Sequence, residues 1–228
     1  MITGVEGVIF DLDGVLVNTA AYHFECWRQL AAEFGKTFTP DQGEGVKGVS
    51  REDALVYVLN VCGIEVPPER HLELATHKDT LFKAMIATLT PRGLLPGALE
   101  ALRWLAERRV PIALASSSEN ARQILRYTGI TDYFDAIVDG HMITRTKPDP
   151  QIFLLAVELL KLEPARCVVV EDAVAGVAGA LAAGCRVIGI GEPDVLSHAD
   201  MVVPAVGSIP LAEMFTSATV LSDPERKE

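Results

Sequence analysis

Short, almost continuously apolar runs that alternate with helix-like stretches most restrict how this chain can fold. Such runs occupy residues 5–11, 110–116, 136–138, 167–171, 186–190 and 201–203. Helix-like stretches stand between the later runs, at residues 98–109, 120–128, 150–162 and 174–183. Strands that are apolar along their whole length are typical of a parallel sheet with both faces covered. Right-handed crossovers then predict an α/β fold with a Rossmann-like, doubly wound sheet.

The stretch from residue 16 to 92 interrupts this alternation. It carries no strand signal, and its apolar periodicity predicts helices at residues 20–34, 51–62 and 68–88. We therefore expect an α/β core domain made of residues 1–15 and 93–228. An all-helical cap domain of residues 16–92 is expected to be inserted after the first strand. The polar tail, residues 222–228, is expected to fray.

The charge balance limits the partners of the chain. Its 228 residues include 20 Lys and Arg against 31 Asp and Glu, which gives a net charge of −11. A nucleic-acid-binding protein needs a basic face, so this class of protein is excluded. A local cation can still reverse the charge inside one pocket, so phosphorylated substrates stay possible. The hydrophobic share of 49% excludes a disordered chain.

Cysteine spacing and the apolar stretches indicate the compartment. Cys26, Cys62, Cys167 and Cys185 are far apart and form no CxxC pair, which favours free thiols in a reducing cytoplasm. The N-terminal residues lack a basic segment, so no signal peptide is expected. The most apolar later stretch, residues 173–184, is too short to span a bilayer. We therefore expect a cytoplasmic protein with no membrane partner.

The sequence Asp11-Leu12-Asp13-Gly14 ends the first predicted strand. Ligands of open α/β sheets gather at the carboxyl ends of the strands, where two carboxylates two residues apart can share one crevice. One carboxylate can act as nucleophile and metal ligand, and the other as general acid/base. The same residues could instead form a strand-ending turn, and the motif alone leaves both interpretations open.

Three further strand ends carry polar residues. The second usable strand ends in three serines that begin with Ser116, Lys147-Pro148 precedes a helix, and Glu171-Asp172 ends the fourth strand. Taken singly, they could be a helix cap, a loop lysine and a solvated turn. Taken together at one sheet edge, they predict phosphoryl transfer through an aspartyl-phosphate, with a hard cation such as Mg²⁺ on the carboxylates.

A glycine pattern in the cap region needs separate treatment. Residues 43–48 read GEGVKG and match the GxGxxG pattern. A dinucleotide site requires this pattern to follow a strand and to open a helix within a βαβ unit. Here the pattern lies in a polar stretch between predicted helices, which favours a flexible loop.

The four strand-end motifs, in this order and spacing, resemble those of the haloacid dehalogenase-like (HAD) phosphotransferases. The likeness extends over almost the whole chain. Residues 19–27 and 47–53 resemble the cap segments of sugar-phosphate mutases within that superfamily. Outside the cap, residues 113–118, Asn120 and residues 133–136 also resemble those mutases.

The resemblance implies roles for the strand-end residues. Asp11 would be the nucleophile, and Asp13 would be the general acid/base while its main-chain carbonyl ligates the metal. Ser116 and Lys147 would hold the transferring phosphoryl group. The implied metal ligands are Asp11, Asp13, Glu171 and Asp172.

The resemblance also implies a substrate site under the cap. His23 and Lys78 would form a polar pair that couples substrate binding to closure, although His23 and Trp27, four residues apart, could instead pack in a helix. The residues implied to hold a second, non-transferring phosphate are Arg51, Ser118 and Asn120. The residues implied to line the pocket are Thr19, Trp27, Lys47, Gly48, Val49 and Ser50.

The implied reaction interconverts β-D-glucose 1-phosphate and glucose 6-phosphate. It would run through an aspartyl-phosphate enzyme and glucose 1,6-bisphosphate, which would also prime the enzyme, with Mg²⁺ as cofactor and the chain as a monomer. A Mg²⁺-dependent sugar-phosphate phosphatase would use the same residues. A non-catalytic sugar-phosphate-binding regulator is a third possibility, but such a protein has no need of the nucleophile Asp11.

Two residues depart from the mutase pattern. Asn18 stands in place of an Asp near the start of the cap, and it keeps the shape but loses the charge. Glu119 stands in place of a Lys between Ser118 and Asn120. A carboxylate there would repel a bound phosphate unless it points to solvent, so the identity of the sugar phosphate stays open.

Overall fold

Six short strands form one parallel sheet at the centre of the larger body of the molecule. This computed structural model describes residues 2–215, so the predicted frayed tail lies outside the described residues. The strands are β1 (Gly7–Phe10), β2 (Ile112–Ala115), β3 (Ala136–Val138), β4 (Cys167–Glu171), β5 (Arg186–Ile190) and β6 (Met201–Val203). Their spatial order is β3-β2-β1-β4-β5-β6, and every neighbouring pair is parallel. The predicted doubly wound α/β fold is confirmed.

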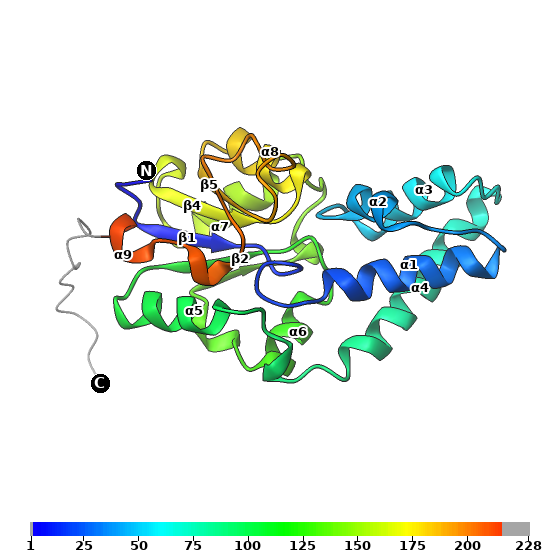
Figure 1. Cartoon of the computed structure of the whole chain (residues 1–228), viewed down its shortest axis with the longest axis horizontal. Helices are drawn as coiled ribbons and strands as arrows, with labels where there is room; N and C mark the ends of the chain where they lie inside the picture. The colour runs from blue at the N-terminus through cyan, green and yellow to red at the C-terminus, as the bar shows by residue number, and fades with distance from the viewer. Residues whose placement is uncertain (1, 216–228) are drawn as a thin grey trace.

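Helices cover both faces of the sheet. The core helices are α5 (Ala98–Glu107), α6 (Ala121–Thr128), α7 (Gln151–Leu160), α8 (Val174–Ala182) and α9 (Leu211–Met214). Val8 and Phe10 of β1 pack with α5 and α6, whereas Ile9 between them packs with α7 and α8. This alternation explains why the strands are apolar throughout, because each of their faces meets a helix layer (Figure 1).

The inserted residues form a second, helical body. Its helices are α1 (Ala20–Glu33), α2 (Pro40–Gly43), α3 (Arg51–Val61) and α4 (His71–Ile86). They enclose their own apolar cluster, in which Trp27 and Leu30 of α1 meet Leu55 of α3 and Leu74 of α4. Figure 1 shows this body, called the cap below, beside the sheet and joined to it by two chain segments.

The two connecting segments lie next to each other. Val17, on the way into the cap, makes an antiparallel bridge to Leu94, on the way out. The Leu95 N–H donates to Leu16 O at 2.9 Å, and the Asn18 N–H donates to Gly93 O at 3.2 Å. Asn18 therefore joins the connection through its backbone, while its side chain is exposed. The proposed domain boundaries after residues 15 and 92 stay a prediction.

The element ends differ from the prediction in detail. The first strand is only Gly7–Phe10, which leaves Asp11 just beyond the strand. The GxGxxG stretch contains the end of α2 and a 3-10 turn, Glu44–Val46, where a loop was expected. The missed signal is a capping box, in which Thr39 and Gln42 each accept a hydrogen bond from the other's backbone N–H. Among residues 2–215, no helix has the length and apolarity needed to cross a bilayer.

Candidate active site

Three adjacent strands bring the predicted strand-end residues together. β1 lies between β2 and β4, and these strands lead into Asp11, Ser116 and Glu171. All three residues are buried. The carboxyl ends of parallel strands share one edge of the sheet, so the topology alone places an acid, a hydroxyl and a second acid in one crevice.

Lys147 is the cation at the centre of this crevice. Its side chain is wholly buried, and its Nζ lies 2.6 Å from Asp11 Oδ1 and 2.5 Å from Glu171 Oε1. The ammonium also donates to Ala115 O at 3.2 Å. Burial alone would lower the pKa of Lys147, but the two carboxylates outweigh it and raise that pKa. Lys147 is therefore a fixed positive charge beside Asp11.

The crevice holds more carboxylates than this one ammonium group can neutralise. Oxygen atoms of Asp11, Glu171 and Asp172 lie within 4.8 Å of one another. Burial, with the charges of Glu171 and Asp13, raises the pKa of Asp11 to about 7, although Lys147 opposes the shift. Burial and the charges of Glu171 and Asp11 raise the pKa of Asp172 well above its usual value. Three hard oxygen donors that share too little positive charge fit a divalent cation such as Mg²⁺.

Gly14 is needed for this arrangement. Its φ of +86° lies in the left-handed region that favours glycine. A Cβ atom at this position would lie 2.1 Å from Asp172 Oδ2, which is an impossible contact. The glycine of the DxDG motif thus lets the chain turn away and leaves room for the third carboxylate.

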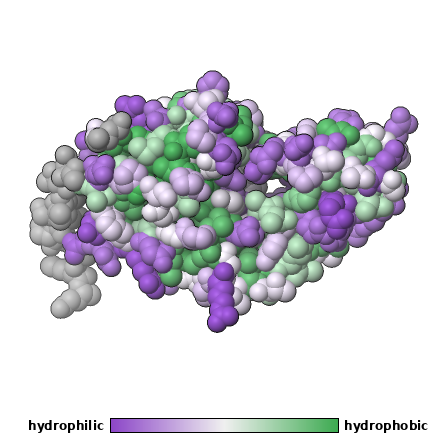
Figure 2. Space-filling model, viewed as in Figure 1, coloured by the Kyte–Doolittle hydropathy of each residue, from purple (hydrophilic) through white to green (hydrophobic). Residues whose placement is uncertain are grey.

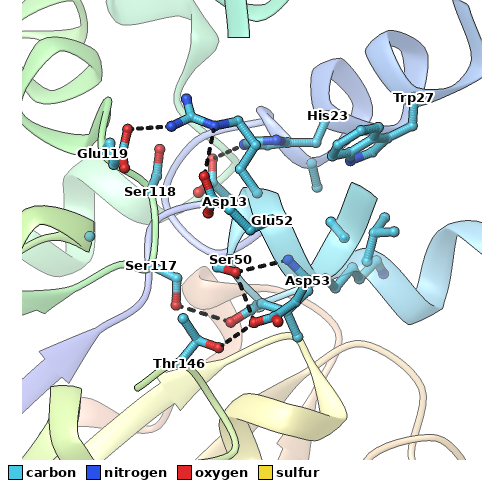
Figure 3. A pocket seen from close by; sticks show the side chains of 18 of the residues that line it. Asp13, His23, Trp27, Ser50, Glu52, Asp53, Ser117, Ser118, Glu119 and Thr146 are labelled. Atoms are coloured by element: carbon cyan, nitrogen blue, oxygen red, sulfur yellow. Dashed lines mark hydrogen bonds and ion pairs between the residues drawn. The ribbon is translucent and has the colours of Figure 1, made fainter. Parts of the chain in front are cut away.

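Asp13 points away from the acid cluster, toward the base of the cap. The Thr19 hydroxyl donates to Asp13 Oδ1. His23 Nε2 lies 3.6 Å from the same oxygen (Figure 3). Burial opposes ionisation of Asp13, but hydrogen bonding from His23 and from the Thr19 hydroxyl lowers its pKa. Asp13 is thus held as a carboxylate, ready to accept a proton.

His23 links Asp13 to Lys78. Lys78 Nζ lies 2.7 Å from His23 Nδ1, and an ammonium can only donate, so Nδ1 is the acceptor. Burial and the charge of Lys78 lower the pKa of His23, which leaves Nε2 as the protonated nitrogen that faces Asp13. The predicted His23–Lys78 pair is present, with Lys78 almost wholly buried between the Trp27 and Phe82 rings.

A cavity of about 810 Å³ lies between the cap and the sheet edge. Figure 2 shows the surface hollowed between the two bodies, with hydrophilic side chains around the hollow. Asp11 and Asp13 form part of its wall. The cap loop closes over the crevice at Gly48, where an added Cβ would lie 3.2 Å from Ala173 Cβ and 3.7 Å from Lys147 Cδ.

Polar contacts join the cap loop to the core. The Ser117 hydroxyl donates to Gly48 O at 3.0 Å, and the Thr146 hydroxyl donates to Asp53 Oδ2 at 2.9 Å (Figure 3). Asp53 also binds Ser50, the N-cap residue of α3. The cap therefore stands in a closed position over the carboxyl ends of the strands.

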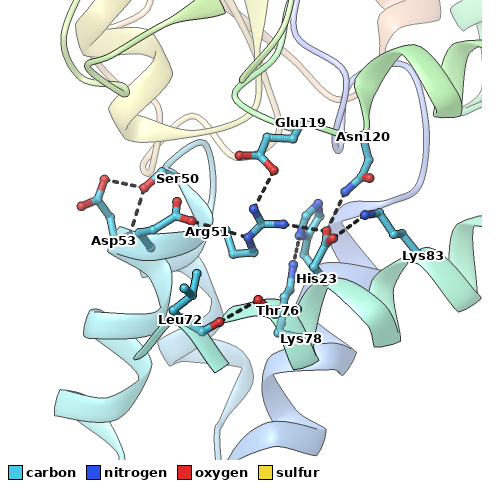
Figure 4. A network of polar contacts seen from close by, with 12 residues as sticks. His23, Ser50, Arg51, Asp53, Leu72, Thr76, Lys78, Lys83, Glu119 and Asn120 are labelled. Atoms are coloured by element: carbon cyan, nitrogen blue, oxygen red, sulfur yellow. Dashed lines mark hydrogen bonds and ion pairs between the residues drawn. The ribbon is translucent and has the colours of Figure 1, made fainter. Parts of the chain in front are cut away.

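A second group of charges lines the cavity beyond Asp13. Arg51 Nη1 lies 2.8 Å from Asp79 Oδ1, and Nη2 lies 2.6 Å from Glu119 Oε2. Asp79 also accepts a hydrogen bond from Asn120 Nδ2 at 2.9 Å and pairs with Lys83 at 2.7 Å. Figure 4 shows Arg51 of the cap reaching across to Glu119 of the core. Glu119 is therefore paired with Arg51, although its side chain is partly exposed.

Ten of the eleven residues predicted to contact substrate line the cavity, and the exception is Thr19. Thr19 is wholly buried in this structure, and its hydroxyl donates to Asp13. Ser116 and Lys147 are buried, and Lys147 donates to Asp11. The ten lining residues are His23, Trp27, Lys47, Gly48, Val49, Ser50, Arg51, Lys78, Ser118 and Asn120. Their roles toward substrate stay predictions.

Four residues that line the cavity and form hydrogen bonds between the cap and the core were not predicted as site residues. Asp79 follows Lys78 directly, and Ser117 stands inside the serine run, so both had a neighbour that was singled out. Asp53 could have been found as the residue three after the N-cap Ser50. Thr146 precedes Lys147 but carries no pattern of its own, and only the closed cap gives it a partner.

Comparison with known proteins supplies the family. A sequence model of the haloacid dehalogenase-like hydrolases matches residues 5–184. The chain belongs to this family. It is 40% identical to the β-phosphoglucomutase of Bacillus subtilis over 209 residues, which are 91% of this chain and 92% of that protein. The likeness to sugar-phosphate mutases of the haloacid dehalogenase-like superfamily, expected from the motifs, is confirmed.

Two further relatives of this haloacid dehalogenase-like chain are named for two different activities, a mutase and a phosphatase. A β-phosphoglucomutase structure from Clostridium difficile superposes with a TM-score of 0.86 at 32% identity and covers 92% of this chain and 95% of its own. A phosphorylated carbohydrates phosphatase from Thermotoga maritima is 34% identical, over 82% of this chain and 85% of its own length. These relatives support a phosphotransferase or hydrolase that acts on sugar phosphates.

Proposed function

We propose that this protein is a β-phosphoglucomutase, which interconverts β-D-glucose 1-phosphate and glucose 6-phosphate. The observation that carries the proposal is the cavity under the closed cap, whose wall includes polar groups in addition to those at the nucleophile. Asp11 and Asp13 form one part of this wall, and Arg51 and Asn120 form another part. A phosphatase needs a phosphate site only at the nucleophile. A mutase that passes through a bisphosphate needs polar groups at both ends of the sugar.

The first half-reaction transfers a phosphoryl group from phosphorylated Asp11 to the sugar. The substrate's C6 hydroxyl oxygen forms the new bond to phosphorus while Asp13 accepts the hydroxyl proton. The bond between phosphorus and the Asp11 oxygen breaks, and its electron pair returns to the carboxylate. Asp13 is ionised beside Thr19 and His23, so it is in the protonation state that can accept this proton. The product is glucose 1,6-bisphosphate.

The second half-reaction runs the same chemistry in reverse on the other phosphate. The bisphosphate turns so that its 1-phosphate faces Asp11, whose oxygen attacks phosphorus. The phosphorus–oxygen bond to C1 breaks, and Asp13 returns its proton to the departing sugar oxygen. Lys147, 2.6 Å from Asp11, stays charged throughout and offsets the negative charge at the transferring group. Glucose 6-phosphate leaves, and the enzyme is again phosphorylated.

Asp11, Glu171 and Asp172, with the main-chain carbonyl of Asp13, are proposed to hold Mg²⁺. When bound, the ion supplies positive charge that reduces the repulsion between an anionic nucleophile and an anionic phosphate. Glucose 1,6-bisphosphate is the proposed priming compound, because it can phosphorylate Asp11 before the first turnover. The closed cap favours transfer to sugar over transfer to water, since Gly48 covers Lys147 and the crevice.

A sugar-phosphate phosphatase is the second candidate. The observation that favours it is the pairing of Arg51 with Asp79 and Glu119, because two nitrogens of this guanidinium already bind carboxylates and not a second phosphate. A phosphatase would use the same Asp11, Asp13 and Lys147 but would accept water in place of the sugar hydroxyl. The Thermotoga maritima relative, named a phosphorylated carbohydrates phosphatase, belongs to this class.

The ratio of two products tests the proposal. Purified protein with Mg²⁺ and a trace of glucose 1,6-bisphosphate is given β-glucose 1-phosphate, and glucose 6-phosphate and free phosphate are both measured. A mutase yields mainly glucose 6-phosphate, whereas phosphate as the main product overturns the proposal in favour of a phosphatase. Asp11→Asn should abolish both products, and Asp41→Asn, on the exposed first turn of α2, should abolish neither.

The proposal includes a cytoplasmic monomer. Cys26, Cys62, Cys167 and Cys185 are all free thiols, as a reducing compartment favours. The cavity is formed between the cap and the core of one chain, so a second copy is not required to complete it. Size-exclusion chromatography with light scattering checks the monomer, and a stable dimer would contradict it.

A further inference from the structure

Glu119 forms an ion pair with Arg51, a cation of the cap that lines the cavity. Its Oε2 accepts from Arg51 Nη2 at 2.6 Å, and the two residues come from the core and the cap, 68 positions apart. Arg51 Nη1 is held by Asp79 at 2.8 Å. The buried Arg51 Nε–H has no hydrogen-bond partner among residues 2–215, because Glu52 lies 3.7 Å away. Two of the three nitrogens of the guanidinium thus already bind carboxylates.

The charges around Arg51 do not favour an additional anion. Arg51, Lys83 and the nearby Lys78 contribute three positive charges, and Asp79, Glu119 and Glu52 offset them with three negative ones. A phosphate that reaches Arg51 Nη2 must displace Glu119, since both need the same donor. Asp79 is fixed by Asn120 and Lys83 in addition to Arg51. Glu119 is 40% exposed and held only by Arg51 among the described contacts, so it is the carboxylate that can move.

We propose that Glu119 is a specificity-determining residue that competes with the remote phosphate of the substrate for Arg51. The inference rests on the proposed mutase function and concerns the same site. Isomerisation requires a second anion at Arg51, so it must displace Glu119. Hydrolysis of an ester that has a single phosphate, bound at Asp11, leaves the Glu119–Arg51 pair in place. Glu119 therefore weakens binding of mutase substrates relative to that of simple phosphate esters.

Two variants and two substrates test this role. Glu119→Gln removes the competing charge, and Glu52→Gln is the matched control, because it removes a carboxylate next to Arg51 that does not hold Nη2. KM is measured for β-glucose 1-phosphate isomerisation and for hydrolysis of p-nitrophenyl phosphate, which has no second anion. Glu119→Gln should lower the first KM about fivefold relative to the second, the scale of one partly exposed ion pair. An unchanged ratio, or an equal change in Glu52→Gln, overturns the inference.

A binding measurement separates this inference from the mutase proposal. Calorimetric titration of glucose 1,6-bisphosphate into Asp11→Asn protein, with and without Glu119→Gln, needs no turnover. A dissociation constant about fivefold lower in the double variant supports the competition even if the wild type only hydrolyses sugar phosphates. An equal dissociation constant in both proteins overturns the role of Glu119 while leaving the mutase proposal standing. Absence of binding in both overturns the two together.

Discussion

At the scale of single residues, the acid cluster depends on a residue that has no side chain. Asp172 and Gly14 come from different strand ends, yet Asp172 Oδ2 lies where a Cβ on Gly14 would be. The two acids of the DxDG motif were predicted because short motifs at parallel strand ends converge. The contact between Gly14 and Asp172 could not be predicted, because it depends on how closely two neighbouring loops approach.

Replacing Gly14 by Ala should disturb the metal site more than the fold. The left-handed φ of +86° costs Ala about 1 to 2 kcal/mol, and its Cβ must push Asp172 aside. We expect Mg²⁺ affinity to fall at least tenfold, as measured by calorimetry. Gly35→Ala is the matched control, with φ of +67° and open space around the added carbon. It should lose similar stability and keep its Mg²⁺ affinity. Equal Mg²⁺ affinity in both variants would contradict the assignment.

The Arg51–Glu119 pair shows where sequence reasoning stops. The resemblance pointed to both positions, but two outcomes for Glu119 were left open, repulsion of a phosphate or exposure to solvent. The structure has a third, an ion pair across the cavity. This ion pair forms only because the cap lies over the core. The two residues are 68 positions apart, so no local sequence pattern predicts their contact.

At the scale of elements, α1 and α4 together hold a buried cation in an apolar setting. Lys78 of α4 lies 5.0 Å from the Trp27 ring centre and 4.7 Å from that of Phe82. Burial, partly offset by nearby acids that include Asp13 and Asp79, lowers the pKa of Lys78 to about 8. A lowered pKa means that the folded protein is less stable with this group charged. Stability is therefore reduced below about pH 8, and the reduction disappears as the pH rises toward 10.5.

Lys78→Met should give a more stable but less active protein. The shift from 10.5 to about 8 corresponds to about 3 kcal/mol at pH 7, which Met would recover apart from the lost bond to His23. We expect a free energy of unfolding about 2 to 3 kcal/mol higher at pH 7, and no gain at pH 10.5 or above. Urea denaturation at both pH values measures this. Lys83→Met, half-exposed on the same helix, should show no such pH-dependent gain. A Lys78→Met protein less stable than wild type would refute the prediction.

The prediction of elements succeeded where packing follows periodicity. All six strands and the seven longer helices were expected, because each has an apolar face that is visible in the sequence. α2 was missed, since Pro40–Gly43 is too short for any periodicity and only its capping box signals it. The helix α5 ends at Glu107 and not at Arg109 as predicted. Arg109 has a φ of +55°, and no local sequence pattern predicts this conformation.

At the scale of the whole molecule, the closed cap and the acid cluster make stability depend on cations. Asp11, Glu171 and Asp172 repel one another, and Lys147 alone offsets them among the described residues in contact with the cluster. A cation that binds only the folded protein stabilises it by mass action, about 2.7 kcal/mol at a hundred times its dissociation constant.

Addition of Mg²⁺ should therefore raise the melting temperature. A chain of this length gains about 2 to 4 °C per kcal/mol, so a rise of roughly 5 to 10 °C is expected near saturation. Differential scanning calorimetry measures the rise, and excess EDTA should reverse it and abolish activity. Asp172→Asn should lose most of the rise, whereas Asp194→Asn, at an exposed position far along the chain, should keep it. A rise of equal size in Asp172→Asn would show that Mg²⁺ acts elsewhere.

The two connecting segments lie side by side, which makes the helical insert a unit that can be exchanged by protein engineering. Because Val17 and Leu94 are bridged, the 76 positions between them leave and rejoin the core at nearly one point. A loop of a few residues could close that gap without moving a strand. The sheet would then keep its acids and its lysine, while the helical body that forms the other wall of the cavity is exchanged. Hybrid proteins that carry another member's helical insert at this junction would keep the strand-end residues and change the cap residues that line the cavity.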